Sequence, residues 1–184
     1  MTEKVFSCLP KIQGWCSKEK SEEIIDNIIE EQHQIYVEIG VYAGASLLPA
    51  LAALTYLRQG KVFAIDPWSN SQCIKNLDYN DPNRKWWKAV DLKQIEDSFL
   101  TMLKNYNFKY KCKILKCSSD EALKKFEDNS IDFLHVDGNS SEESTYNDVK
   151  NYFPKIKDGG YILLSKINLN INGSKLKGKA AEYF

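Results

Sequence analysis

The chain has 184 residues, of which 43% are hydrophobic and 12% aromatic, enough for one domain with its own core. Its 25 basic residues balance its 25 acidic residues, so neither nucleic acid nor an anionic membrane is expected as the main partner. No apolar run approaches the roughly 18 residues of a membrane span. The five cysteines form no CxxC pair. These features favour a cytoplasmic protein with free thiols and without a zinc site.

Strands and helices are predicted to alternate along the chain. Ser17 is expected to cap a helix over about residues 18–31, which carries an isoleucine stripe. The β-branched run at 35–39 predicts a buried strand, and the leucine spacing over 45–58 predicts a helix. The remaining elements follow in chain order: a strand at 62–65, a helix at 88–106, a strand at 112–116, a helix at 120–126, a strand at 131–136, a helix at 142–153, a turn at 158–160, a strand at 161–164 and a short helix at 174–183.

This alternation indicates the α/β class, with a parallel sheet covered on both faces. Right-handed crossovers favour a Rossmann-like, doubly wound parallel sheet of about five strands flanked by helices. We expect one domain over residues 1–184, with a helical extension at 1–33 and the sheet core at 34–184. Ligands of such sheets bind beyond the carboxyl ends of the strands. The unusual residues of the sequence fall at those ends: 38–46, 66–68, 118–120, 137–140 and 165–168.

The stretch IYVEIGVYAGAS, residues 35–46, predicts a tight turn between a strand and a helix. Gly40 and Gly44 would bring backbone N–H groups close to a ligand, and the helix N-terminus favours an anion. Dinucleotide-binding proteins use GxGxxG, but Tyr42 stands in the place of the second glycine. Its side chain would hinder a pyrophosphate, so a carboxylate fits better. A tight turn without a ligand is the alternative interpretation.

Asp66 ends the second predicted strand, 26 residues after Gly40. A carboxylate at this place can accept both hydroxyls of a ribose. An Asp-Pro turn is the alternative interpretation. Together the turn and Asp66 point to a nucleoside that carries a carboxylate, for which S-adenosylmethionine is the obvious candidate.

Four stretches carry a family resemblance: YVEIGVYAGAS, VFAIDPW, IDFLHVDGN and FPKIKDGGYILL. In order and spacing they resemble class I S-adenosylmethionine-dependent methyltransferases. The resemblance covers about residues 11–184 and is closest to the small-molecule O-methyltransferase-like branch, with the macrolide O-methyltransferases and the cephalosporin hydroxylase group. It implies S-adenosylmethionine as cofactor and a small-molecule acceptor. The cofactor-binding residues that we expect are Glu38, Gly40, Tyr42, Gly44, Ser46, Asp66, Trp68, Ser119, Asp120 and Asp137.

Asp137 and Lys166 are the expected catalytic residues. Relatives read DGNHS or DGDHS where this chain has DGNSS, and they often end the fifth strand in two acids, or an acid and an amide, where it has Ser165-Lys166. In metal-dependent relatives those acids help to hold a divalent cation, which needs several oxygen ligands. We therefore predict no catalytic metal. The ammonium of Lys166 is hypothesised to replace the cation and pair with Asp137; a surface lysine is the alternative.

The family normally adds two further strands after the last helix, and this chain is expected to lack them. The exposed sheet edge would then pair in a homodimer, or the chain is a shortened version of a longer protein. The aromatic residues of the long connection after the second strand are interpreted either as a lid over the acceptor or as anchors to the core. They are Trp68, Tyr79, Trp86 and Trp87.

His135 is expected to be a core histidine. The sequence thus predicts metal-independent O-methylation of a small molecule. The alternative is a catalytically degenerate cofactor-binding or scaffold protein of the same fold. A nicotinamide-dependent oxidoreductase is disfavoured by Tyr42.

Overall fold

The computed structural model describes residues 1–138, 141–165, 170–171 and 174–175. Within these ranges the core is a parallel five-stranded sheet in the order β3-β2-β1-β4-β5. This confirms the predicted Rossmann-like sheet. The strands are β1 (Ile35–Ile39), β2 (Lys61–Ile65), β3 (Cys112–Leu115), β4 (Ile131–Val136) and β5 (Ile156–Leu164).

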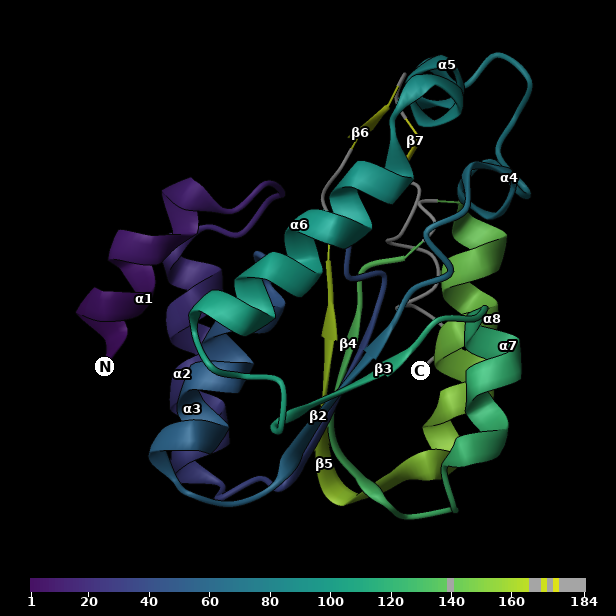
Figure 1. The fold of residues 1–184 in the computed structure, drawn as a ribbon. Coiled ribbons are helices and arrows are strands. Elements are labelled where there is room, and N and C mark those ends of the chain that lie inside the picture. The colour runs from purple at the N-terminus through teal and green to yellow at the C-terminus, as the bar shows by residue number, and fades with distance from the viewer. Residues whose placement is uncertain (139–140, 166–169, 172–173, 176–184) are drawn as a thin grey trace.

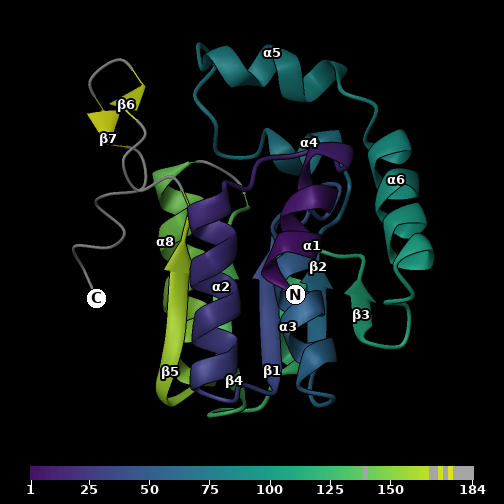
Figure 2. The same ribbon diagram turned by 90° about the vertical axis from the view of Figure 1, so that its left-hand side faces the viewer.

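Helices cover both faces of the sheet (Figure 1). One face carries α1 (Thr2–Cys8), α2 (Lys18–Glu30), α3 (Leu47–Tyr56) and α6 (Leu92–Asn105). The other face carries α7 (Ser119–Ala122) and α8 (Glu142–Tyr152). Two short helices, α4 (Asn70–Cys73) and α5 (Pro82–Ala89), lie beyond the carboxyl ends of the strands (Figure 2). Within the described ranges no helix is long and apolar enough to cross a lipid bilayer.

The alternation of side chains along β1 explains the two cores. Tyr36 points to the face of α2 and α3, where it joins Ile24, Leu51 and Phe133. Val37 points to the opposite face. The strand is therefore buried on both faces, as its continuous apolar run predicted.

Helix boundaries follow from capping side chains. Ser17 Oγ accepts a hydrogen bond from the Lys20 N–H and starts α2, as predicted. The predicted helix over 88–106 is wrong at its start, because the Asp91 carboxylate accepts from the Gln94 N–H and begins α6 at Leu92. Asp81 caps α5 separately, at Pro82. The predicted helix over 120–126 ends early, because its last turn is a 3₁₀ helix, Leu123–Lys125.

Two predictions near the C-terminus are also corrected. The predicted turn at 158–160 lies inside β5, where the pairing register with β4 shifts between Ile131 and Phe133. The extra residues make an irregularity within the strand rather than its start. Residues 174–175, predicted as the start of a helix, form the short strand β7, which pairs antiparallel with β6 (Asn170–Ile171). The remainder of that predicted helix lies outside the described residues.

Candidate active site

A cavity of about 690 Å³ opens at the carboxyl ends of β1, β2 and β4. The chain order of the sheet reverses beside β1, since β2 and β3 lie on one side of it and β4 and β5 on the other. Such a switch point is where doubly wound sheets bind ligands. The predicted residues among its lining are Gly40, Tyr42, Ser46, Asp66, Ser119, Asp120 and Asp137. Its size falls within the range of small-molecule and cofactor sites.

The turn after β1 is held by hydrogen bonds from both sides. Gly40 has φ +84°, and its N–H donates to the Ile65 carbonyl over 2.9 Å. A Cβ atom at Gly40 would lie 2.4 Å from Gly138 Cα, so only glycine lets this turn approach the end of β4. Asp66 Oδ2 accepts from the N–H groups of Val41 and Tyr42, each over 2.9 Å.

Asp66 is therefore a support of the turn as well as a part of the cavity wall. Its Oδ1 accepts from the Trp68 N–H over 2.7 Å. Burial raises the pKa of the Asp66 carboxyl, and these three N–H donors partly offset that effect. A carboxylate offers about four lone-pair directions, so about one remains for a ligand hydroxyl. Accepting hydrogen bonds from both ribose hydroxyls, as expected from the sequence, would require Asp66 to give up one of its hydrogen bonds from a backbone N–H group.

Three of the expected site residues lie behind the cavity wall and are absent from its described lining. Glu38 is fully buried and accepts hydrogen bonds from Tyr36 and Ser46. A Cβ atom at Gly44 would lie 2.6 Å from Met102 Cε, so this glycine permits packing against α6. Trp68 is buried, and its indole Nε1 donates to the Tyr42 carbonyl. These residues shape the turn from behind.

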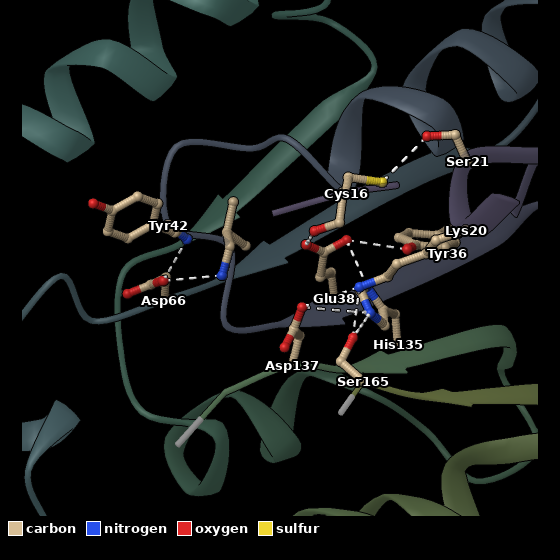
Figure 3. A network of polar contacts seen from close by, with 12 residues as sticks. Cys16, Lys20, Ser21, Tyr36, Glu38, Tyr42, Asp66, His135, Asp137 and Ser165 are labelled. Carbon is tan, nitrogen blue, oxygen red and sulfur yellow. Dashed lines mark hydrogen bonds and ion pairs between the residues drawn. The ribbon is translucent and has the colours of Figure 1, made fainter. Parts of the chain in front are cut away.

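Among the described residues, a cation from α2 lies beside Asp137. Lys20 Nζ lies 3.1 Å from Asp137 Oδ2 and 2.5 Å from Ser165 Oγ (Figure 3). Lys166, the expected partner of Asp137, lies outside the described residues. The sequence reasoning missed Lys20, although a signal was present, because Lys20 precedes the fully buried Ile24 by one helical turn. It thus lies on the isoleucine stripe that faces the sheet.

His135 lies beneath this ion pair and is fully buried. Its Nε2 is 2.7 Å from Ser165 Oγ. Its Nδ1 is 3.0 Å from Glu38 Oε2, an ion-pair distance rather than a well-aligned hydrogen bond. The imidazole therefore joins the end of β4 to β1 and β5, in keeping with a core histidine. Figure 3 shows the side chains of Lys20, Glu38, His135, Asp137 and Ser165 converging.

An aromatic cluster forms the wall of the cavity near α5. It joins Trp15, which precedes α2, with Tyr42 and with the two tryptophans of α5. The ring centroids of Trp15 and Tyr42 lie 5.5 Å apart, and those of Trp86 and Trp87 lie 4.7 Å apart. Trp15 was not predicted for the site. Trp15 and Trp86 are exposed, whereas Trp68 is packed on Phe99.

At the opposite end, the cavity is lined by the start of α7. A capping box between Ser118 and Glu121 begins this helix. The Ser119 hydroxyl donates to Asp148 of α8, which also lines the cavity. Asp120 adds a carboxylate to the same wall.

One cysteine, Cys73, lines the cavity in the described part of the chain. Burial raises the pKa of the Cys73 thiol, which lines the cavity, to about 12. A thiol with this pKa stays protonated at neutral pH. The described residues contain no group of three or more His, Cys, Asp or Glu side chains that could hold a metal ion. The absence of a catalytic metal stays a prediction.

The fold and the cavity define an α/β protein of the Rossmann-like type with a ligand site at its switch point. A family model described as a methyltransferase domain matches residues 37–165. The chain belongs to this methyltransferase-domain family. A search of curated protein sequences finds no match.

Solved structures of similar fold include O-methyltransferases and other methyltransferases. The O-methyltransferase NovP is 20% identical, with a TM-score of 0.67, over 90% of this chain and 69% of NovP. TomG from Streptomyces achromogenes, an O-methyltransferase involved in tomaymycin synthesis and solved in complex with SAM, is 12% identical, with a TM-score of 0.66, over 92% of this chain and 69% of TomG. The SAH-bound methyltransferase PaMTH1 from Podospora anserina is 13% identical, with a TM-score of 0.65, over 99% of this chain and 75% of PaMTH1. At these identities the likeness concerns the fold.

Proposed function

We propose that this chain binds S-adenosylmethionine in the cavity and methylates a hydroxyl group of a small-molecule acceptor without a catalytic metal. The observation that carries the proposal is the convergence of the Gly40 turn, Asp66 and Asp137 on one cavity at the switch point of the sheet. The family match supports methyl transfer. The similar folds of TomG, solved with SAM, and PaMTH1, solved with SAH, support the choice of cofactor.

The residues present fit this cofactor. The apolar side chains of Ile39 and Ile65 and the carboxylates of Asp66 and Asp137 share one wall, and Ser119 and Asp120 lie at one end. A nucleoside needs apolar contact for its base and acceptors for its hydroxyls. In this proposal Asp66 takes a ribose hydroxyl, and Ser119 and Asp120 lie by the adenine. Gly40, Tyr42 and Ser46 line the methionine end.

When bound, S-adenosylmethionine would supply a methyl group that is transferred from its sulfonium to the acceptor oxygen, while the electron pair of the broken carbon–sulfur bond stays on sulfur. The chain's own part is to orient the acceptor and to take its proton. Asp137 is the carboxylate that we assign to this proton, because it lines the cavity and is fixed by Lys20. The aromatic wall of Trp15 and Trp86 excludes water and offers an apolar face to the acceptor.

The test is calorimetric titration of the metal-stripped protein, in EDTA, with S-adenosylmethionine and with S-adenosylhomocysteine, using NAD as a control ligand. We expect micromolar dissociation constants for both and no heat from NAD. Folded protein that binds neither would contradict the proposal. Cofactor binding that requires a divalent metal would contradict its metal-independent part.

Turnover is tested with radiolabelled methyl donor and a panel of phenols, catechols and sugars. Asp137→Asn should keep the fold and lose about 100-fold in rate. Asp97→Asn, on the exposed side of α6, should behave as the unchanged protein. Cofactor binding without transfer to any acceptor in the panel would favour the alternative of a degenerate cofactor-binding protein. The observation that supports this alternative is that Ser165 stands where relatives often have an acid.

Two further expectations stay predictions. A homodimer through a sheet edge would use β3 or β5, the edge strands of the described sheet. Light scattering at several protein concentrations tests it. Cytoplasmic localisation is tested by fractionation of cells that express the chain.

A further inference from the structure

The ion pair of Lys20 and Asp137 is built across the fold rather than along one element. Lys20 belongs to α2, near the N-terminus, whereas Asp137 follows β4 and Ser165 follows β5. The side chains of Lys20 and Asp137 are only 19% and 12% exposed. An ammonium that is largely removed from water is stable only if its partners compensate for the lost hydration. Here those partners are one carboxylate oxygen and one hydroxyl oxygen.

Lys20 reaches the cavity only through its partner. Asp137 lines the cavity and Lys20 does not. The ammonium is therefore placed to orient the carboxylate and to change the potential that the cavity presents.

In the described part of the chain, a second carboxylate lies near this ion pair. Glu38 is fully buried behind the turn, and its Oε2 lies beside the His135 ring. Burial raises the pKa of the neighbouring Cys16 thiol, so this thiol adds no further negative charge at neutral pH. Lys20 is thus the basic side chain that balances Asp137 in the described network (Figure 3).

We propose that Lys20 is a positioning residue of the methyl-transfer site, whose ammonium fixes the Asp137 carboxylate and balances its charge beside the sulfonium of the donor. This inference rests on the proposed function. A lone carboxylate next to a sulfonium would stabilise the donor before reaction, and that stabilisation slows the transfer. The ion pair keeps the carboxylate oriented toward the acceptor while limiting this ground-state attraction.

The inference predicts a discrimination between two ligands that differ by one methyl group and one positive charge. S-adenosylmethionine carries the sulfonium, and S-adenosylhomocysteine carries a neutral thioether. Lys20→Met keeps an unbranched side chain of nearly the same length and removes its charge. We expect it to raise the affinity for S-adenosylmethionine about 10-fold relative to S-adenosylhomocysteine, because one positive charge near the sulfonium is lost.

Two matched variants control for the substitution. Lys20→Arg keeps the charge and should keep the ratio of the two dissociation constants. Lys18→Met removes an exposed lysine from the first turn of the same helix and should also keep this ratio.

Asp137→Asn should change the ratio in the opposite direction. The ammonium then stays without its carboxylate, so the affinity for S-adenosylmethionine should fall about 10-fold relative to that for S-adenosylhomocysteine. If Lys20→Met fails to fold, Lys20→Gln takes its place, because it removes the same charge and keeps an N–H donor for Asp137 and Ser165.

Calorimetric titration of the five proteins with both ligands measures these ratios without any acceptor. A ratio that is unchanged in the folded, uncharged Lys20 variant, while both ligands bind, would leave Lys20 a structural residue and overturn this inference alone, whatever Asp137→Asn does. An unchanged protein that binds neither ligand would overturn the proposed function and this inference with it. A merely structural role would weaken both ligands alike and leave their ratio constant.

Discussion

The carboxylate of Asp66 lies within 2.9 Å of the backbone nitrogen of Tyr42, and this hydrogen bond ties the end of β2 to the turn that follows β1. The same oxygen accepts from Val41, and the other oxygen accepts from Trp68. An acid at this place therefore shapes the cavity even before any ligand is bound. Its role in binding and its role in folding are coupled.

Asp66→Asn should lower both stability and cofactor affinity. An amide has only one acceptor oxygen, so at least one buried N–H group loses its partner, at a cost of about 1–3 kcal/mol. Urea unfolding measures the first effect and titration with S-adenosylhomocysteine the second. Asp97→Asn, on the surface of α6, is the control and should change neither. Equal stability of Asp66→Asn and the unchanged protein would show that these backbone contacts contribute little.

Gly44→Ala should destabilise the protein through a clash with α6. Gly44 has φ +88°, and a Cβ atom there would lie 2.6 Å from Met102 Cε and 2.8 Å from Phe99 Cδ2. Gly159→Ala is a matched control, because Gly159 has φ +75° and a Cβ atom there would meet no described atom within 4 Å. The control should lose about 1 kcal/mol for backbone strain, and Gly44→Ala about 1–3 kcal/mol more. Similar losses in both variants would argue against the packing role of Gly44.

The lowered pKa of the Asp132 carboxyl predicts that the stability of the protein depends on pH. Burial alone would raise the pKa of this carboxyl, but the hydrogen bonds from Lys157 and from the N–H groups of Ile35 and Gln34 outweigh burial and lower it. A lowered folded pKa means that the unfolded chain binds the proton more tightly. The stabilisation is therefore complete above the unfolded value of about 3.9 and is lost as the pH falls through the folded pKa.

Asp132→Asn should consequently cost about 1–3 kcal/mol at neutral pH, and the difference should shrink as the pH falls below about 4. Urea midpoints between pH 3 and pH 7 measure both. Asp128→Asn, whose carboxylate is exposed and pairs with Lys155, is the control and should show a smaller loss. A difference between Asp132→Asn and the unchanged protein that stays constant with pH would contradict this account.

The tryptophans of the long connection should divide into two groups. Trp68 is 7% exposed and donates to the Tyr42 carbonyl, so Trp68→Ala should cost about 3–5 kcal/mol. Trp86 is 43% exposed and lines the cavity, so Trp86→Ala should cost less than about 1 kcal/mol and weaken acceptor binding. Urea unfolding and acceptor titration of the cofactor complex separate the two. A large loss of stability in Trp86→Ala would make it an anchor as well.

The sequence anticipated the sheet because its signals are local. Each signal can be recognised from a few neighbouring residues: the buried run at 35–39, the glycines of the following turn and the acid at the end of the next strand. The starts of helices were harder to predict from the sequence. The stretch that holds α5 and α6 favours helix throughout, and only the capping residues Asp81 and Asp91 mark where each helix begins. The turn predicted at 158–160 failed for a similar reason, because pairing with β4 carries the strand through it.

The sequence by itself determined the alternation of elements, the place of the ligand edge and the family, because periodicity and turn chemistry act over short distances. Only the tertiary structure showed that Lys20 pairs with Asp137, since Lys20 lies 117 residues away in the chain. It also placed Glu38, Gly44 and Trp68 behind the cavity wall and brought Trp15 into it. These outcomes depend on how α2 and the turn after β1 pack on the sheet, and packing between distant segments has no local signal.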